Sequence, residues 1–323
     1  SYWPSEDFTD MQPSIGYYDD AQPETLRKHI VQASGAGLRY FSFYWYWNPA
    51  NGGAESYVLG LKAFLQASNR ANMHFSVTPC LHPWMDGDVS LRIPYDQIVK
   101  AANTIVDNYL TQPNYLRAND GRPIISLCDA RGIGNGTESQ LDTGATRQFT
   151  DAIRARARAV LGEEVLITFN GAPPANTGLE GSQCLGQFDP SRSYQQYVNN
   201  QRSYFQTLPG ILMRCATSGF DERPRIAIAI GDPGPNTAAL QQAFRWYGDA
   251  DLPKFQQLLA NVRADIDQST RPSTVDNFVL LYAWNEWHEG GYIEPNKRDG
   301  CAYLNAVRQQ LSLTGGTGCV AQP

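Results

Sequence analysis

The chain has no block of basic residues and no long apolar run. Its 26 lysines and arginines are outnumbered by 32 aspartates and glutamates, and the formal net charge is −6. Nucleic-acid binding requires a basic patch, so this composition argues against nucleic acid as a partner. No apolar stretch approaches the roughly 20 residues that span a membrane, which argues against a membrane protein. The oligomeric state is not readable from the sequence.

Metal and cofactor motifs are also scarce. There is no Cys-x-x-Cys pair, and the four histidines are scattered along the chain. A dedicated metal site is therefore not expected, and a metal-dependent hydrolase is the least favoured alternative. No Gly-x-Gly-x-x-Gly follows the first expected strand, which argues against a dinucleotide cofactor. No serine or cysteine lies in a nucleophile-elbow pattern. We expect no cofactor.

The cysteines number six, and an even count fits an oxidising compartment. We therefore expect a secreted or periplasmic protein. Two pairs bracket helical stretches and could close disulfides, namely Cys184 with Cys215 and Cys301 with Cys319. Cys80 and Cys128 end two neighbouring expected strands. For that pair, a disulfide and two buried free thiols are both compatible with the sequence.

Strand-like and helix-like stretches alternate along the chain. The expected strands are Ser14–Asp20, Leu38–Trp47, His74–Cys80, Pro123–Asp129, Val165–Gly171, Cys184–Phe188, Ile211–Ala216 and Phe278–Trp284. The expected helices are Pro23–Ala36, Glu55–Ala71, Tyr95–Leu110, Thr143–Leu161, Tyr194–Leu208, Leu252–Ile266 and Cys301–Leu311. This alternation predicts an α/β protein with a single (β/α)₈ barrel of the TIM type. Residues 1–323 would form one catalytic domain with a C-terminal helix and tail, and a doubly wound open sheet is the alternative.

In such a barrel the functional site lies at the C-terminal ends of the strands. The polar and aromatic residues expected at those ends, and hence at a substrate site, are Asp19, Tyr44, Tyr46, Trp47, His82, Trp84, Asp86, Asp129, Asn170 and Asp221. A single aspartate after a strand is more often a turn former or helix cap than a functional group. The convergence of many such residues is better evidence than any one of them. Aromatic planes among them would suit the C–H faces of sugar rings.

The most informative segment follows the last strand. Glu286 and Glu289 lie three residues apart, with Trp284, Trp287 and His288 around them. Hydrolysis of a glycosidic bond uses two carboxyl groups, one as acid and the other as base or nucleophile. Aromatic neighbours lower the local polarity and favour a proton-donating carboxyl group. The competing interpretation makes Glu289 a solvated loop residue and Trp287 a packing residue.

Two further titratable residues are interpreted as structural. Glu294 is followed by a proline, which suggests a turn. His29 falls on an expected helix and is interpreted as a surface residue.

Six segments together resemble glycoside hydrolase family 99 and the related bacterial WbsX-type proteins of polysaccharide gene clusters. They are Ile15–Asp19, Phe43–Trp47, Trp84–Gly87, Phe220–Arg225, Trp284–Pro295 and Arg298–Leu304. The most specific part is the Asn-Glu-Trp-x-Glu-Gly stretch, and the resemblance extends from about Ile15 to Leu311.

This resemblance implies a (β/α)₈ barrel that hydrolyses α-mannosidic links with retention, mostly in endo mode. It implies that Glu286 is the base acting on the substrate 2-hydroxyl, which gives a 1,2-anhydro sugar intermediate. It also implies that Glu289 protonates the leaving group and then activates water. WbsX-type relatives have been labelled glycosyltransferases, although paired carboxylates fit hydrolysis better.

The sequence thus favours a retaining, endo-acting glycoside hydrolase whose partner is a polysaccharide or oligosaccharide. A hydrolase or transglycosylase of a different polysaccharide remains open, because only the sugar-contacting loops would differ. A carbohydrate-binding barrel without catalysis is the rival from another class. A bare binding site has no need of a close carboxylate pair, which is costly to build.

Overall fold

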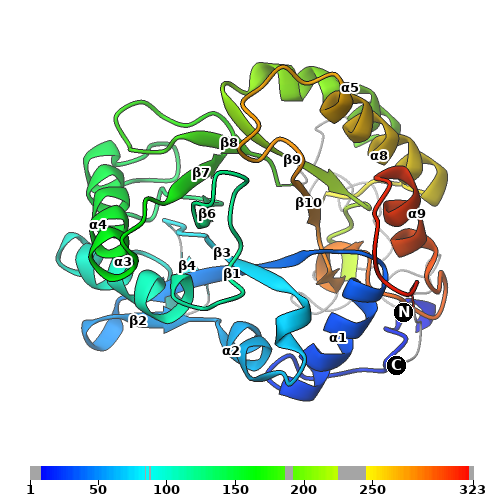
Figure 1. The fold of residues 1–323 in the computed structure, drawn as a ribbon, viewed down its shortest axis with the longest axis horizontal. Coiled ribbons are helices and arrows are strands. Elements are labelled where there is room, and N and C mark those ends of the chain that lie inside the picture. The colour runs from blue at the N-terminus through cyan, green and yellow to red at the C-terminus, as the bar shows by residue number, and fades with distance from the viewer. Residues whose placement is uncertain (1–8, 84, 87–88, 186–191, 225–244, 320–323) are drawn as a thin grey trace, which may run out of the picture.

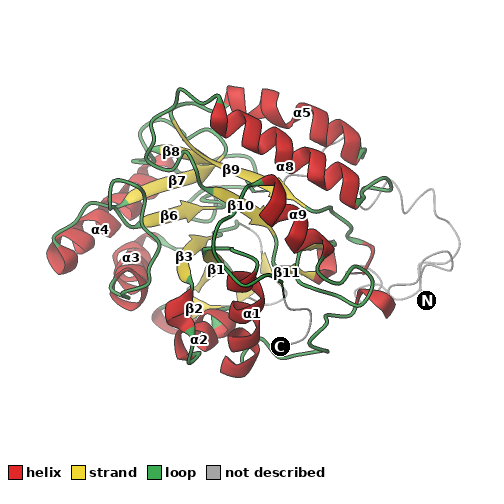
Figure 2. Cartoon of the chain, turned by 45° about the vertical axis from the view of Figure 1, so that its right-hand side comes forward, coloured by secondary structure: helices red, strands yellow, loops and turns green. Residues whose placement is uncertain are grey.

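The computed structural model describes residues 9–83, 85–86, 89–185, 192–224 and 245–319 of the chain. Within these residues the strands are arranged around a centre and the helices lie outside them (Figure 1). The turned view shows the same two layers, with helices flanking the strands (Figure 2). This alternation confirms the α/β class expected from the sequence.

The main sheet has eight strands, in the order β10-β9-β8-β7-β6-β3-β1-β2. Their bounds are β1 Tyr40–Asn48, β2 Ala54–Ser56, β3 His74–Pro79, β6 Ile124–Leu127, β7 Leu166–Asn170, β8 Gly181–Gln183, β9 Ile211–Thr217 and β10 Val279–Tyr282. All neighbours from β1 to β10 pair in parallel, and β2 pairs antiparallel with β1. In the described residues the sheet therefore has seven parallel strands, one fewer than a complete (β/α)₈ barrel, with an antiparallel hairpin strand beside β1.

The helices follow the strands in the expected order. Their bounds are α1 Pro23–Gly35, α2 Leu59–Gln66, α3 Ile98–Ile105, α4 Thr143–Leu161, α5 Tyr194–Thr207, α8 Leu252–Asp267 and α9 Ala302–Gln310. Short turns of 3₁₀ or π type cover Thr9–Met11, Ala50–Gly52, Arg70–Asn72, Tyr95–Gln97, Val106–Leu110 and Trp287–Glu289. Two small hairpins complete the described elements, β4 Met85–Asp86 with β5 Val89–Ser90 and β11 Asn285–Glu286 with β12 Gly291–Tyr292. In the described part of the chain, no helix has the length and apolar character needed to cross a membrane.

Three expectations about elements are wrong. Ser14–Asp20 is no strand: Gly16 has a φ of +83° and its N–H bonds back to Pro13, which makes a turn. The sixth strand is Gly181–Gln183, just before the expected Cys184–Phe188. Its polar sequence lacks the apolar pattern from which strands were predicted. Phe188 lies outside the described residues. Within the expected helix Glu55–Ala71, the first residues form β2 and the helix starts at Leu59.

The two ends of the parallel series, β1 and β10, meet through side chains. Among the described residues no backbone ladder joins these two strands. Tyr40 donates its hydroxyl hydrogen to the Val279 carbonyl at 3.3 Å, and its ring lies 6.0 Å from that of Phe278. Further along, the Phe41 ring lies 5.5 Å from Trp284. Aromatic side chains thus fill the place where two adjacent barrel strands would hydrogen-bond.

Side-chain alternation along β1 separates the interior of the strand ring from the outer layer. Trp45 and Trp47 are fully buried within the hydrophobic core, and the Trp47 indole donates to Gln97 at 2.7 Å. Tyr44 and Tyr46, on the opposite face, line a cavity described below. One strand therefore supplies core on one side and candidate site residues on the other.

All six cysteines are paired. The disulfides join Cys80 to Cys128, Cys184 to Cys215 and Cys301 to Cys319. The last two pairs are those favoured by the spacing, and the first resolves the alternative that the sequence left open. The Cys80–Cys128 bond connects residues that directly follow β3 and β6, two adjacent strands of the sheet. It therefore ties together two C-terminal strand ends.

A buried arginine on β9 forms two ion pairs. Arg214 on β9 is fully buried, and its guanidinium contacts Asp265 at 2.6 Å and Asp276 at 2.9 Å. Removing the cation would leave both carboxylates without their partner in a region of low polarity.

We expect Arg214→Met to lower the free energy of unfolding by about 3–5 kcal/mol, the range typical when one member of a buried ion pair is lost. Urea denaturation followed by circular dichroism measures this change. Arg147→Met is the matched control, because Arg147 and Asp151 form an exposed pair on α4. The control should change stability by under about 0.5 kcal/mol. Equal effects of the two substitutions would contradict the structural role of Arg214.

Candidate active site

The two glutamates predicted as catalytic lie on a tight hairpin that follows β10. Glu286 ends β11 and pairs with Gly291 of β12, while Glu289 ends the 3₁₀ turn between these strands. Gly290 closes the turn with a φ of +60°. The hairpin is thus a rigid support that places two carboxyl groups three residues apart on one short loop.

Close packing explains the two glycines of this hairpin. A Cβ at Gly290 would come within 2.8 Å of the Asp221 Cβ, and one at Gly291 within 2.6 Å of the Tyr282 ring. Neither distance is tolerated by real side chains, so only glycine lets the hairpin lie this close. The Asp221 N–H also donates to the Glu289 carbonyl at 2.6 Å. The glutamates are therefore fixed against the ends of β9 and β10.

Two tyrosines, one on β10 and one on β1, interact with the carboxyl groups. The Tyr282 hydroxyl, at the end of β10, donates a hydrogen bond to Glu289 Oε2. Burial, together with the negative charge of Glu289, raises the pKa of Tyr282 well above its usual value. Burial likewise raises the pKa of Tyr44 on β1, with contributions from Tyr46, Glu286 and Glu289. Both phenols therefore keep their protons, and Tyr282 donates its own to Glu289.

A cavity of about 1100 Å³ opens between β1 and β10. Its lining near the hairpin includes Tyr44, Tyr46, Tyr57, Trp284, Asn285 and Glu286. Glu289 is not among the lining residues, but Tyr282, its hydrogen-bond partner, is. The same cavity also reaches residues at the N-terminal ends of the strands, among them Arg39, His74 and Asn277, so only part of its volume lies beside the hairpin. That part carries aromatic faces beside a carboxyl group.

A buried polar network lies behind the hairpin, and it corrects one expectation. His29 is buried rather than on the surface, and Glu294, at a bend in the chain, is 1% exposed. Glu294 Oε1 lies 3.1 Å from His29 Nε2. Its other oxygen accepts hydrogen bonds from the Tyr18 hydroxyl at 2.6 Å and from the Trp287 indole at 3.2 Å. Glu294 therefore connects α1 to the loop that carries Glu286 and Glu289.

The sequence reasoning missed this network because its members are distant in the chain. Asn285 completes it by donating to Tyr18 at 3.2 Å and to Asp20 at 3.4 Å. The spacing of Glu294 from Trp287, seven residues along an irregular loop, carries no periodic signal. Only the packing of α1 against the hairpin brings His29 and Tyr18 to it.

A second polar group lies at the ends of β3 and β6. His82 Nδ1 is 2.9 Å from Asp129 Oδ2, and Arg131 contacts the same carboxylate at 2.7 Å. Burial alone would raise the pKa of Asp129, but hydrogen bonds from His82 and Arg131 lower it to about 2. The Tyr46 ring lies 6.3 Å from that of His82, which connects this group to the aromatic face of β1.

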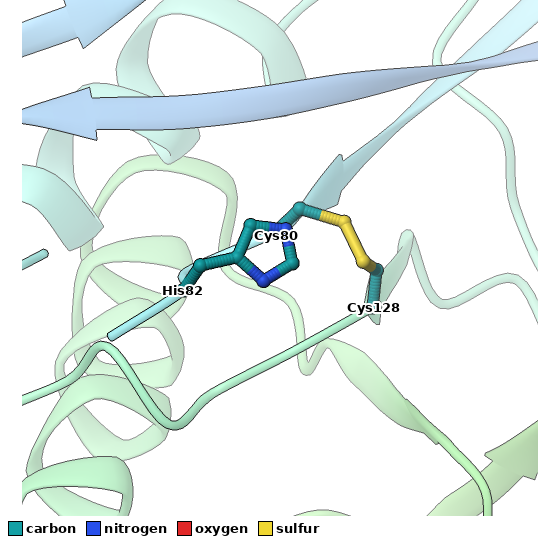
Figure 3. Close-up of side chains that lie close together, drawn as sticks. All are labelled: Cys80, His82 and Cys128. Atoms are coloured by element: carbon teal, nitrogen blue, oxygen red, sulfur yellow. A yellow bond between two sulfur atoms is a disulfide. The ribbon is translucent and has the colours of Figure 1, made fainter. Parts of the chain in front are cut away.

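His82 also lies beside the Cys80–Cys128 disulfide (Figure 3). These three residues are the only group of potential metal ligands found within the described part of the chain. Both sulfur atoms are bonded to each other, so neither is available as a thiolate ligand. The expectation that the protein uses no metal ion stays a prediction.

The remaining predicted site residues are placed unevenly. Asp221 accepts hydrogen bonds from Arg223 at 2.8 and 2.6 Å and lies against the Glu289 loop. Trp284 lines the cavity. Trp287 stacks on Tyr292, with ring centroids 4.0 Å apart. Asn170 ends β7 and accepts from the Leu185 N–H at 3.1 Å.

Others do not join the cavity. Trp47 is 0% exposed and belongs to the core, so the structure contradicts its place at a substrate site. Asp19 is exposed and accepts hydrogen bonds from the Ala21 N–H and the Gln22 amide in the turn before α1. Its neighbour Asp20 lines the cavity instead. His288 is exposed on the hairpin turn. Trp84 and the side chain of Asp86 lie outside the described residues.

The chain is similar to known proteins both in sequence and in fold. Residues 187–307 match the family described as Glycosyltransferase WbsX. The GH99 endo-alpha-mannosidase from Bacteroides thetaiotaomicron, solved with BIS-TRIS-propane, superposes with a TM-score of 0.60 at 15% identity, covering 94% of this chain and 88% of that one. The family match covers less than half of the chain, and the structural likeness, at 15% identity, shows a shared fold.

Further likenesses agree on the fold. A glycoside hydrolase family 5 enzyme from Prevotella bryantii B14, solved with a xyloglucan tetradecasaccharide, has a TM-score of 0.51 at 12% identity, covering 90% of this chain and 88% of that one. The protein WxcX of Xanthomonas campestris pv. campestris strain B100 is 24% identical over 331 residues, or 94% of this chain. The chain spans 43% of the length of that relative. The (β/α)₈-type fold predicted from the sequence is thus confirmed.

Asp129→Asn should test the His82–Asp129–Arg131 group by its pH dependence. The folded-state pKa of about 2 lies below the usual value of 3.8 for an aspartate, so the carboxylate stabilises the fold above pH 3.8 and loses this effect as the pH falls through 2. We expect the variant to lose about 2 kcal/mol at pH 7 and the difference to shrink near pH 2. Urea unfolding at both pH values measures it. Asp151→Asn on the surface should show neither effect.

Proposed function

We propose that the protein is a glycoside hydrolase that cleaves inside a polysaccharide chain with net retention. The observation that carries this proposal is the hairpin that holds Glu289 on buried Tyr282 and places Glu286 on the wall of a cavity lined by aromatic residues. The likeness to a family 99 endo-alpha-mannosidase and a family 5 glycoside hydrolase supports it at the level of fold. An α-mannan-like glycan is the proposed substrate class, by resemblance to the family 99 enzyme.

The proposed chemistry assigns one role to each glutamate. Glu286 takes the proton of the substrate 2-hydroxyl, whose oxygen attacks the anomeric carbon and forms a 1,2-anhydro sugar. Glu289 gives its proton to the departing glycosidic oxygen in the same step. Water then opens the anhydro ring: Glu289 takes a proton from the water and Glu286 returns one to the 2-oxygen. Each carboxyl group is thereby restored, and two successive inversions give retention.

Surrounding residues are proposed to bind substrate. Tyr44, Tyr46 and Trp284 offer ring faces on the cavity wall. His82, held by Asp129, offers an imidazole beside Tyr46. We propose that substrate binding also involves Asp86, Asn170, Asp221 and Trp287. Trp47 is not proposed to bind substrate, and Asp20 is proposed in place of Asp19. Residues 1–323 would act as one catalytic unit, and the three disulfides support a secreted or periplasmic location.

The match to a family described as Glycosyltransferase WbsX favours a second candidate, transfer of a glycosyl group to an acceptor sugar. Hydrolysis and transfer share the first step and differ in whether water or a sugar hydroxyl accepts the glycosyl group. Product analysis separates them: a hydrolase releases reducing ends, whereas a transferase yields products longer than the substrate. Lengthened products without a net increase in reducing ends would favour the transferase.

Glu286→Gln and Glu289→Gln should each lower the rate of glycan cleavage by about 10³-fold or more, because neither amide can exchange a proton in the reaction. The assay is release of reducing ends from α-mannan, α-glucan, galactan and arabinan, with oligosaccharide sizes followed in parallel. Glu164→Gln is the control, since Glu164 pairs with Arg158 on the surface. Full activity in both site variants would show that the assigned roles are wrong.

Tyr282→Phe should lower kcat about 10-fold and leave KM within about 2-fold, because the lost hydrogen bond positions Glu289 rather than the substrate. Steady-state kinetics on the polysaccharide cleaved by the wild type gives both constants. Tyr204→Phe on α5 is a suitable control, since Tyr204 belongs to the cluster packed around α5 and α8. A large rise in KM with unchanged kcat would contradict a positioning role for Tyr282.

A further inference from the structure

One tyrosine on the cavity wall is exposed to solvent and has no role in the proposed reaction. Tyr57 follows β2, lines the cavity and remains 53% exposed. Leu59, at the start of α2, also lines the cavity and is 66% exposed. Exposed apolar surface is costly in water, and a cluster of it at the rim of a pocket indicates contact with a ligand. Both residues thus expose apolar surface on the cavity lining.

The backbone at Tyr57 is held in an unfavourable conformation. Its φ is +54°, in the left-handed region that bulky residues rarely adopt. Such a conformation costs on the order of 1–3 kcal/mol and persists only where the surrounding structure enforces it. Here the residue in that conformation has its aromatic ring on the cavity wall, edge to face with Tyr46.

The segment before Tyr57 is firmly anchored. Glu55 accepts hydrogen bonds from Tyr109 at 2.6 Å and from the Trp45 indole at 3.4 Å, and it pairs with Lys62 at 2.8 Å. In the preceding turn, a Cβ at Gly53 would come within 2.2 Å of Gln97 Oε1. The hairpin of β1 and β2 is therefore preorganised, so Tyr57 would lose little freedom when a ligand binds.

Tyr57 also extends a line of aromatic rings that starts at the glutamates. Tyr44, beside Glu286, has its ring centroid 6.3 Å from that of Tyr46. Tyr46 in turn lies 5.6 Å from Tyr57, edge to face. The three rings thus lead from the proposed reaction centre to the mouth of the cavity, continuous with the site already described.

A hydrogen-bond acceptor lies next to the start of α2. A Cβ at Gly60 would be 3.8 Å from the Asp20 Cβ, so the start of α2 packs beside Asp20. Asp20 lines the cavity and accepts a hydrogen bond from Asn285 at 3.4 Å. An aromatic face with a nearby carboxylate is the pairing that binds a pyranose ring, because the C–H face stacks and the hydroxyls donate.

We propose that Tyr57, with Leu59 and Asp20, forms a sugar-binding subsite adjoining the site at Glu286 and Glu289 that holds an internal residue of an uncharged polysaccharide. This inference rests on the proposed function and deepens it, because a subsite beyond the reacting sugar selects long chains and so favours cleavage in endo mode. Tyr57 binds substrate through its ring face and takes no part in the bond-breaking step.

The test is affinity electrophoresis in gels that contain α-mannan, α-glucan, galactan or arabinan, in the Glu289→Gln background so that the polysaccharide is not degraded. Tyr57→Ala should weaken the retardation constant about 5- to 10-fold, as expected for loss of one stacked ring. Tyr57→Phe keeps the ring and should bind like the parent. Val99→Ala is the matched control, because Val99 is an exposed apolar residue on α3 away from the cavity lining.

Each outcome decides the proposal. Retardation of Tyr57→Ala equal to the parent would overturn the subsite, even if Glu289→Gln abolishes cleavage. If Tyr57→Phe weakens retardation as much as Tyr57→Ala does, ring stacking is not the basis of the subsite. Absence of retardation in all four gels would also overturn the subsite. If Tyr57→Ala alone binds more weakly while the wild type cleaves none of the four polysaccharides, the subsite stands and the proposed hydrolase does not.

Discussion

The close packing of the Asn285–Tyr292 hairpin on the ends of β9 and β10 is the constraint on which the rest of the site depends. Gly290 lies against Asp221 and Gly291 against the Tyr282 ring, with no space for a Cβ at either position. Because the hairpin cannot lift away, Tyr282 reaches Glu289 and Glu286 reaches the cavity. Two glycines thereby convert a loop into a rigid support, which catalysis by positioned carboxyl groups requires.

The opening between β1 and β10 gives the site its volume. In a closed barrel, backbone hydrogen bonds would join these strands and their side chains would fill the centre. Here the contact is made by Tyr40, Phe41, Phe278 and Trp284, which hold the two strands near one another without a backbone ladder in the described residues. The cavity follows this seam, and the tyrosines on both strands become its walls.

A buried polar network secures the hairpin from behind. Glu294 binds Tyr18 and Trp287 and lies beside His29, all within an apolar surrounding. A buried carboxylate is costly unless it is satisfied, so this network strongly disfavours other arrangements of α1 and the loop. The side chains that position the site are thus different from those that would carry out the reaction.

The order of strands and helices followed from the sequence because apolar periodicity and turn residues report local structure. Thr143–Leu161, for example, was predicted with its observed bounds, since Asp142 caps its start and Gly162 ends it. The Glu286–Glu289 pair was visible for the same reason: both residues lie in one short, distinctive segment. What the sequence could not give were contacts between distant segments. The burial of His29 and Glu294, the core position of Trp47, the strand at Gly181–Gln183 and the exposure of Tyr57 all depend on which elements pack together. Only the tertiary structure decided them, because burial is a property of neighbours in space and leaves no local pattern in the chain.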